Sequence, residues 1–387
     1  MTIEEILAMP EVERKIYYLK KGRKTEQPNA HALYNDWNPN KHEIVIDEEK
    51  YPKIKITTQP EKRITDPTTG KEYVEPAARK EVDPNRIALP IEQDIVNIQT
   101  AFTVGTEPVL DCQPDQSEES LLSTLKQVFK KNKLKYQNKK VVRAWLAEQE
   151  VAEYWYVVKD DGFWAKLKRK ISGIFGKSKP EYRLKSAIWS PFRGDKLYPF
   201  FNDQGDLVAL SREYKKKDLN DVEITCFMTI TKDMVYQWEL TSNWTDKGSF
   251  AHGFKKMPVI YMYRPEAYCE KIKSLRVRLE KLLSNYADCI DYHFFPILML
   301  FGNVENFSGE FKNRVVELTG QGANAQYLTW SQVPDTVKFE VETLLSQIYG
   351  LTNTPRISFD SLKGTGNAVS GVTFDYVFMS THLNVEI

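Results

Sequence analysis

Residues 265–293, PEAYCEKIKSLRVRLEKLLSNYADCIDYH, carry the pattern that decides the fold. Their apolar positions alternate between spacings of four and three, in the order Tyr268, Ile272, Leu275, Leu279, Leu282, Tyr286, Cys289 and His293. Such a repeat predicts a long helix with one narrow apolar seam of the heptad type. Pro265 suits the first helical position, and Glu266 suits the first turn because the helix dipole favours acids there. We place this helix at residues 265–291, which at 1.5 Å per residue gives a length of about 40 Å.

The remainder of this helix surface is charged. Its acids are Glu270, Glu280, Asp288 and Asp291, and its cations are Lys271, Lys273, Arg276, Arg278 and Lys281. Charged side chains are rarely buried unless they are paired. We therefore expect these cations to lie on a surface that is wet or that faces another subunit.

A short module and a second helix follow. Pro296 breaks the first helix, and the run 297–302 is β-prone, as is the run 325–330. A second apolar seam of Val337, Val341, Leu344 and Ile348 predicts a helix from about Asp335. Gly350 stands where a helix commonly places a glycine just after its end. The two helices thus bracket a small insertion.

Two further segments complete the pattern. Residues 351–355, LTNTP, lead into the Gly-rich stretch 363–371, KGTGNAVSG, and then into another helical pattern. Upstream, residues 86–90, RIALP, precede a helical spacing of apolar residues over 91–102, and VGTEPV follows at 104–109.

In this order, the elements resemble the portal protein of tailed bacteriophages, of the siphophage type. The resemblance implies an α+β fold with an α/β wing, a two-helix stem, a small α/β clip between the stem helices, and a tunnel loop. By this resemblance the parts are the wing with an N-terminal arm at 1–264, stem helices at 265–291 and 334–350, the clip at 292–333, the tunnel loop at 351–371 and the start of a tunnel helix at 372–387. The order and spacing of the elements carry the resemblance, because no single motif is diagnostic.

The resemblance also implies a function. Portal proteins form a ring at one capsid vertex, by resemblance a homododecamer, through which viral DNA is packaged and ejected and to which the tail is attached. The implied partners are double-stranded DNA without sequence preference, the terminase large subunit, a head-tail adaptor or neck protein, and the major capsid and scaffolding proteins. The implied location is the virion, after assembly in the host cytoplasm.

The loop residues expected to face the channel are Lys363, Gly364, Thr365, Gly366, Asn367 and Ser370. Lys363 and the polar side chains could contact phosphates, and the glycines allow backbone conformations that other residues avoid. The alternative interpretation is an ordinary surface loop with a helix N-cap at Ser370. In the stem, the resemblance gives roles to the cations between Lys271 and Lys281 named above.

The rest of the chain predicts further elements. Residues 1–25 are expected to form two short helices split at Pro10, and 26–90 an extended arm with a hairpin that turns at 66–70. Helices are predicted at 118–132 and 137–149, and strands between 151 and 239. Residues 162–180 form a basic amphipathic pattern, which suits either a contact with nucleic acid, scaffold or an anionic surface, or a solvated insertion folded onto the wing.

Composition narrows the class of protein. The 387 residues are 41% hydrophobic, enough for a sizeable core, and 54 Lys and Arg against 53 Asp and Glu give a net charge of +1. That balance argues against a protein whose whole surface grips nucleic acid, and a DNA conduit would bind only weakly and without sequence preference. The four cysteines have no spacing typical of a disulfide framework or a zinc site, and no apolar run is long enough to span a bilayer.

Catalytic motifs fail on spacing. Gly176, Lys177 and Ser178 resemble the end of a P-loop, but Ile171 stands where its first glycine is needed. The five histidines show no metal-binding pattern, so no catalytic residue, metal or cofactor is assigned. Two alternatives to the portal stay open: a metal-dependent enzyme of nucleic-acid processing that uses scattered acids, and another head-completion structural protein. Since the helical pattern continues to Ile387 without a cap, we also expect a truncated chain.

Overall fold

The computed structural model describes the whole chain except residues 60–61, 66–71, 107–109, 111–114, 116–117, 160–181, 218, 220, 294–296, 308–315, 329–333 and 357–387. It divides into two compact units. The first comprises Met1–Asn38, Pro90–Lys271 and Leu351–Ile387, and the second comprises Pro39–Leu89 and Ile272–Gly350. The chain therefore passes between the units four times, and each unit is built from segments far apart in sequence.

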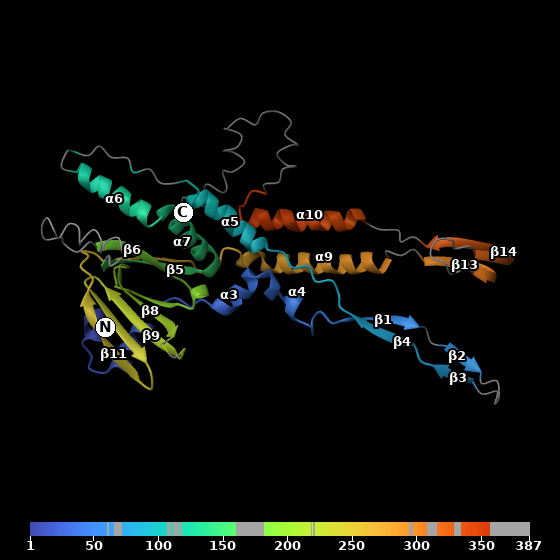
Figure 1. Cartoon of the computed structure of the whole chain (residues 1–387), viewed down its shortest axis with the longest axis horizontal. Helices are drawn as coiled ribbons and strands as arrows, with labels where there is room; N and C mark the ends of the chain where they lie inside the picture. The colour runs from blue at the N-terminus through green and yellow to red at the C-terminus, as the bar shows by residue number, and fades with distance from the viewer. Residues whose placement is uncertain are drawn as a thin grey trace, which may run out of the picture. The chain divides into compact units, whose positions relative to one another are not determined.

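Two antiparallel sheets form the framework of the first unit (Figure 1). Five consecutive strands make a meander in the order β11 (Trp244–Ala251), β10 (Met234–Leu240), β9 (Glu223–Thr231), β8 (Leu207–Lys217) and β7 (Lys196–Phe201). The second sheet has the order β12 (Val259–Tyr263), β5 (Glu150–Lys159) and β6 (Tyr182–Trp189). Apolar residues from both sheets, among them Tyr154, Leu197 and Ile230, share one core cluster.

The N-terminal helices cover part of the meander. Helices α1 (Ile3–Leu7) and α2 (Val12–Lys21) bury Ile6 and Leu19 in a cluster with Phe227 and Trp238. The Thr2 side chain accepts a hydrogen bond from the backbone of Glu5, and the Glu5 carboxylate accepts one from the backbone of Thr2. This capping box confirms the expected start of the first helix.

Among the described residues of the first unit, four more α-helices are present: α3 (Ala30–Trp37), α5 (Ile91–Val104), α6 (Glu119–Lys131) and α7 (Leu134–Glu148). The helices predicted near residues 91, 118 and 137 are confirmed as α5, α6 and α7. Helix α7 packs against α5 and β5, and it buries Val141 and Ala144 with Val151 and Ile188. An apolar stripe on α7 therefore joins the helical layer to the three-stranded sheet.

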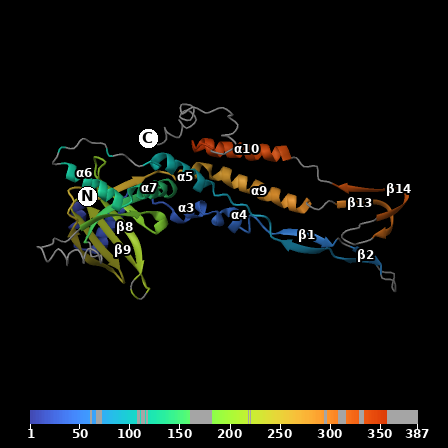
Figure 2. The ribbon, with the colours of Figure 1, turned by 45° about the horizontal axis from the view of Figure 1, so that its top comes forward.

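The second unit contains a helix pair and several two-stranded ribbons. Its elements are η1 (Pro39–Lys41), α4 (Glu43–Ile46), the pair β1 (Ile54–Gln59) and β4 (Ala78–Val82), the pair β2 (Lys62–Thr65) and β3 (Glu72–Glu75), α9 (Lys273–His293), the hairpin β13 (Ile297–Phe307) and β14 (Val316–Leu328), and α10 (Pro334–Leu351). Figure 2 shows, as Figure 1 does, α9 and α10 side by side and running in opposite directions. The hairpin β13–β14 is the insertion between them in the sequence.

The first long helix begins later than Pro265. A short 3-10 turn, η3 (Glu270–Ile272), precedes α9, and the residues before it bond elsewhere. The Tyr268 N–H donates to the Leu146 carbonyl at 3.0 Å, and the Arg264 N–H donates to the Gln149 carbonyl at 2.8 Å. Because the Tyr268 N–H bonds to α7 and not to the Arg264 carbonyl, the expected first turn does not form.

The second helix ends differently from the expectation. Gly350 lies inside α10, which continues to Leu351, so it is not the residue that follows the helix. The left-handed backbone conformation falls instead on Asn353, whose φ is 46°. Asparagine is the residue that most often replaces glycine in that conformation.

Other expectations are corrected in part. The hairpin predicted within 26–90 is present as β2–β3, although its turn lies outside the described residues, but α3 and α4 were not expected. The insertion was expected to be α/β, whereas its described residues form only the hairpin β13–β14. Strands β7 and β11 were missed because Pro199 interrupts one and Asp246, Lys247 and Gly248 the other.

None of the helices in the described part of the chain has the length and apolar content needed to span a bilayer.

Candidate functional site

The paired helices α9 and α10 each bury one apolar face. Leu279 is fully buried on α9, and Leu344 and Ile348 are buried on α10. Toward solvent, the Arg278 guanidinium donates from Nε and Nη2 to Glu340 Oε1 at 2.9 and 2.6 Å. Because both side chains are substantially exposed, this ion pair contributes less than about 1 kcal/mol. The ion pair alone is therefore a weak link between the two helices.

A second face of α9 is polar and buried. Arg276, Glu280 and Ser284 are each at most 2% exposed, and they recur every four residues, so they lie in one row along the helix. Asp288 continues the row. Glu280 Oε2 lies 3.7 Å from Arg276 Nη1, and Glu280 Oε1 lies 2.6 Å from His42 Nδ1.

An extended segment at 85–89 runs along this polar row. The Leu89 N–H donates to Glu280 Oε1 at 2.9 Å, the Ile87 N–H to Ser284 Oγ at 2.9 Å, and the Asn85 N–H to Asp288 Oδ1 at 2.7 Å. Two residues of extended chain and four residues of helix both advance by about 6 Å, so the two repeats stay in register. Side chains of α9 thus satisfy the backbone of a segment that belongs to no sheet.

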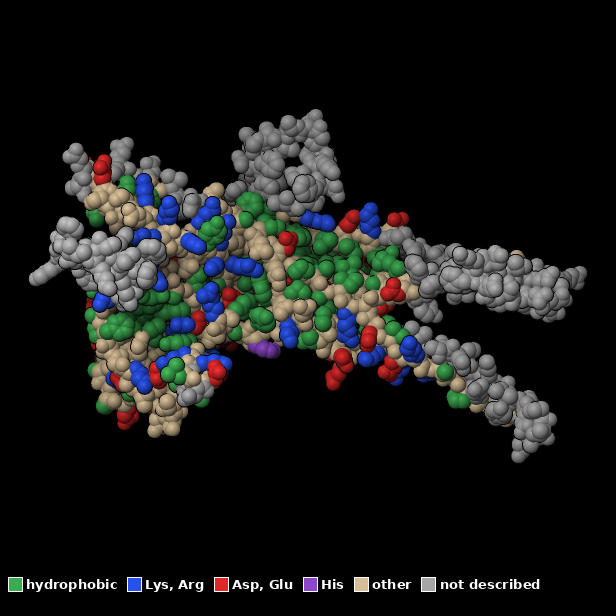
Figure 3. Space-filling model, in the orientation of Figure 1, with side chains coloured by type: hydrophobic (Ala, Val, Ile, Leu, Met, Phe, Trp, Pro, Cys, Tyr) green, Lys and Arg blue, Asp and Glu red, His purple; other side chains and the backbone are tan. Residues whose placement is uncertain are grey.

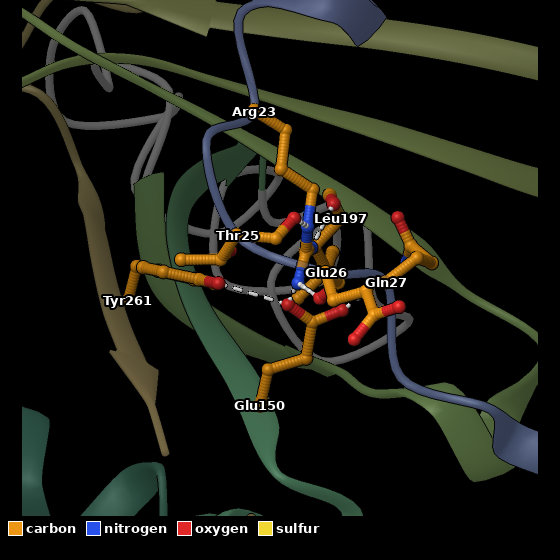
Figure 4. A network of polar contacts seen from close by, with 7 residues as sticks. All are labelled: Arg23, Thr25, Glu26, Gln27, Glu150, Leu197 and Tyr261. Atoms are coloured by element: carbon orange, nitrogen blue, oxygen red, sulfur yellow. Dashed lines mark hydrogen bonds and ion pairs between the residues drawn. The ribbon is translucent and has the colours of Figure 1, made fainter. Parts of the chain in front are cut away.

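In the first unit, a buried ion pair ties the N-terminal segment to both sheets (Figure 4). Arg23 Nη1 donates to Glu150 Oε2 at 2.7 Å and to the Leu197 carbonyl at 2.6 Å. Tyr261 Oη donates to the same Glu150 oxygen at 2.8 Å, and Gln27 Nε2 donates to the other at 3.3 Å. Burial raises the pKa of Glu150, while the contacts with Arg23 and Tyr261 oppose that rise.

The residues that follow α10 are anchored within the first unit by Gln99 of α5. Its side-chain amide donates to Thr354 Oγ1 at 2.9 Å and approaches the carbonyls of Thr352 and Asn353 at 3.4 and 3.3 Å. Tyr268 Oη donates to the Thr352 carbonyl at 2.5 Å. Since Gln99, Thr352 and Thr354 are all at most 5% exposed, this anchor is fixed well before the Gly-rich stretch begins.

Within the ranges that the structure describes, no group of three or more His, Cys, Asp or Glu side chains is placed to hold a metal ion. The buried acids are instead bonded to neighbours. Glu148 accepts from the Phe192 N–H at 2.7 Å, and its pKa is raised to about 7 because burial disfavours the charged form.

Comparison with protein families decides the assignment. The model of the family described as phage portal protein, SPP1 Gp6-like, matches residues 19–387. The chain belongs to this family. Its function is therefore that of a portal, a channel at one capsid vertex for viral DNA, and the family is a structural one rather than a family of enzymes. A search of curated proteins found no significant match.

The five cations predicted to lie on the stem differ in their exposure to solvent. Lys271 and Lys281 are exposed, Arg278 is exposed in its ion pair with Glu340, and Lys273 is half-buried. Arg276 is the exception, because at 2% exposure it belongs to the buried polar row and not to a surface that is wet or faces another subunit, as was expected. The residues near α4 and the segment 85–89 cover that face of α9, so one of the five predicted cations cannot face solvent.

The residues predicted to face the channel all lie outside the described residues: Lys363, Gly364, Thr365, Gly366, Asn367 and Ser370. The basic segment 162–180 and residues 372–387 also lie outside them. Gln99 was missed by sequence reasoning, and nothing in its local pattern marks it, because its partners are more than 250 residues away. The row of Arg276, Glu280 and Ser284 does have a signal, its spacing of four, but the apolar seam beside it was the stronger pattern.

Proposed function

We propose that copies of this portal chain close into a ring, dodecameric by resemblance, in which neighbouring α9–α10 pairs pack against one another. The observation that carries the proposal is Phe339, an aromatic side chain that is 72% exposed on α10. Ile290 of α9 is also 38% exposed. Figure 3 shows hydrophobic side chains along the visible face of both helices. Apolar surface of this kind is typical of protein interfaces, and a ring would cover it.

Within that ring we assign the predicted parts to their roles. Helices α9 and α10 would form the stem, the hairpin β13–β14 the clip, and the first unit most of the wing. The loop at 351–371 would line the channel, where Lys363 and its polar neighbours meet phosphates. The anchor on Gln99 supports this role, because a loop that moves as DNA passes needs a fixed origin.

The partners follow from the family. They are double-stranded DNA, the terminase large subunit, a head-tail adaptor or neck protein, and the capsid and scaffolding proteins, met at the virion vertex after assembly in the host cytoplasm. The net charge of +1 supports a conduit, since a strongly basic bore would retain DNA through counterion release. The mechanism is geometric and electrostatic, with no bond made or broken by this chain.

The ring proposal is tested by the effect of Phe339→Asp on assembly. We expect wild-type protein to give a species many times the chain mass of 45.0 kDa in light scattering, and the variant to shift toward the monomer while its circular dichroism is unchanged. Leu219→Asp is the matched control, because Leu219 is fully exposed in a turn of the first unit and should leave assembly intact. A wild-type monomer that binds divalent metal would favour the nuclease-like alternative instead.

A further inference from the structure

A groove of about 510 Å³ lies beside the C-terminal half of α6 in the first unit. Its apolar lining comes from Leu110, Phe129, Leu134 and Tyr136, and its charged lining is Lys126, Lys130, Lys133 and Lys135. No carboxylate is among the described residues that line it. The described lining thus combines apolar side chains, here called the apolar floor, with four charges that are all positive, here called the lysine rim.

Among the described residues, little covers the apolar side of helix α6. No residue of this 13-residue helix is buried, and Leu121 and Leu125 are 69% and 43% exposed. The apolar residues Leu121, Leu122, Leu125, Val128 and Phe129 nevertheless follow the spacing of one helical face. An amphipathic helix with nothing buried is normally covered by another molecule, and this face leads directly into the groove.

The corner between α6 and α7 holds the groove in shape. Lys133 adopts a left-handed backbone conformation with φ of 50°, and Asn132 donates from Nδ2 to the carbonyls of Val128 and Leu184 at 3.0 Å each. The second of these bonds fixes the corner to β6. The backbone between α6 and α7 is therefore held at this corner, so less of it has to be ordered on binding. Figure 3 shows Lys and Arg side chains gathered over α6 and α7.

We propose that this groove binds a negatively charged amphipathic helix of a partner protein. Its leucine-type side chains would cover Leu125, Phe129 and Leu134, and its carboxylates would pair with the lysine rim. A helix with an apolar face and acidic side chains matches both the apolar and the cationic lining of the groove. Amphipathic helices bind other proteins in the same way, with the apolar face in a groove and charges that complement its edge. Duplex DNA would satisfy the lysines but leave the apolar floor wet, so a protein helix is the better fit. The proposal does not depend on ring formation.

The test uses a fluorescently labelled synthetic helix with leucines on one face and glutamates elsewhere. We expect it to bind the purified protein in anisotropy titrations, and to bind more weakly as salt is raised, since salt screens the lysine rim. The same peptide with lysines in place of glutamates should not bind. Lys130→Glu combined with Lys133→Glu should weaken binding at least tenfold, and Leu125→Ser should weaken it without changing the salt dependence.

Lys24→Glu combined with Lys255→Glu is the matched control, because both lysines are exposed in the first unit away from the groove and the change in net charge is the same. This control should bind the peptide as wild type does. The proposal would be overturned if the wild-type protein bound neither peptide, if it bound both equally, or if the control lost binding as well. A labelled DNA duplex that competed fully with the acidic peptide, and that lost binding in the Lys130 and Lys133 variant, would make the groove a nucleic-acid contact instead.

Discussion

Replacing Arg23 by methionine should destabilise the first unit far more than the loss of a surface charge. Arg23 Nε donates to the Thr25 carbonyl at 2.9 Å and Nη2 to the Glu26 carbonyl at 2.6 Å, in addition to its bonds with Glu150 and Leu197. Methionine keeps the apolar stem but leaves the Glu150 carboxylate, which is 0% exposed, without its cation. Breaking a buried pair in this way costs about 3–5 kcal/mol.

The free energy of unfolding is measured by urea denaturation followed through tryptophan fluorescence. The deficit of Arg23→Met should shrink at low pH. The pKa of Glu150 is raised in the folded protein above its ordinary value of 4.5. The stability linked to the protonated carboxyl is therefore fully present below pH 4.5, and it is lost as the pH rises through the pKa of the folded protein. The double variant with Glu150→Gln should recover at least about 1 kcal/mol, because it no longer buries a lone charge.

Lys215→Met is the control, since the Lys215–Glu223 pair is exposed on both sides, and its loss should cost less than about 1 kcal/mol. If Arg23→Met lost no more than this control, and the double variant recovered nothing, the network in Figure 4 would be no stronger than a surface ion pair. The reasoning that it fastens the N-terminal segment to the sheets would then be wrong.

Four further outcomes are expected. Glu148→Gln should gain stability over wild type as the pH rises from 4.5 through about 7, by up to about 3 kcal/mol, because the wild-type carboxyl must ionise while buried; parallel stability curves would contradict this. Gln99→Leu should cost about 1–3 kcal/mol and speed amide exchange at residues 352–356, and unchanged exchange there would mean that the anchor is not needed. Lys363→Ala should leave assembly intact but alter the retention of DNA, because an exposed lysine contributes little to stability. Gly364→Pro should impair packaging more severely, because proline fixes the backbone. Normal packaging in both variants would mean that the loop is a passive connector. DNA binding should be weak, and its affinity should fall steeply as the salt concentration rises. A footprint on one defined sequence that survives high salt would contradict this expectation.

Local patterns in the sequence predicted much of the fold. The seam of Leu275, Leu279 and Leu282 identified α9, and the capping pair of Thr2 and Glu5 located α1, because both signals need only neighbouring residues. Strands β8, β9 and β10 were recognised for the same reason, whereas β7 and β11 were missed. In contrast, α4 has four residues and lies below the length at which periodicity is informative. Its place is set by packing against α9, far away in the sequence.

The polar contacts could not be predicted in the same way. Arg276 looked like a surface cation, because nothing in its own helix shows that the segment 85–89 and His42 bond to the same face of α9. The late start of α9 has the same origin, since the N–H of Tyr268 is taken by the Leu146 carbonyl of another helix. Such bonds join residues that are from 120 to 240 positions apart, and only the folded chain brings them together.

The central claim is that copies of this chain close into a ring around a channel. Electron microscopy of the purified protein, imaged along the ring axis, tests it most directly. We predict closed rings with a central opening and rotational symmetry, twelvefold by resemblance, in which α9 and α10 of neighbouring copies are in contact through Phe339. The claim would be contradicted if the protein remained a single 45.0 kDa chain even at concentrations well above those used for imaging. Association into open filaments without a bore would contradict it as well.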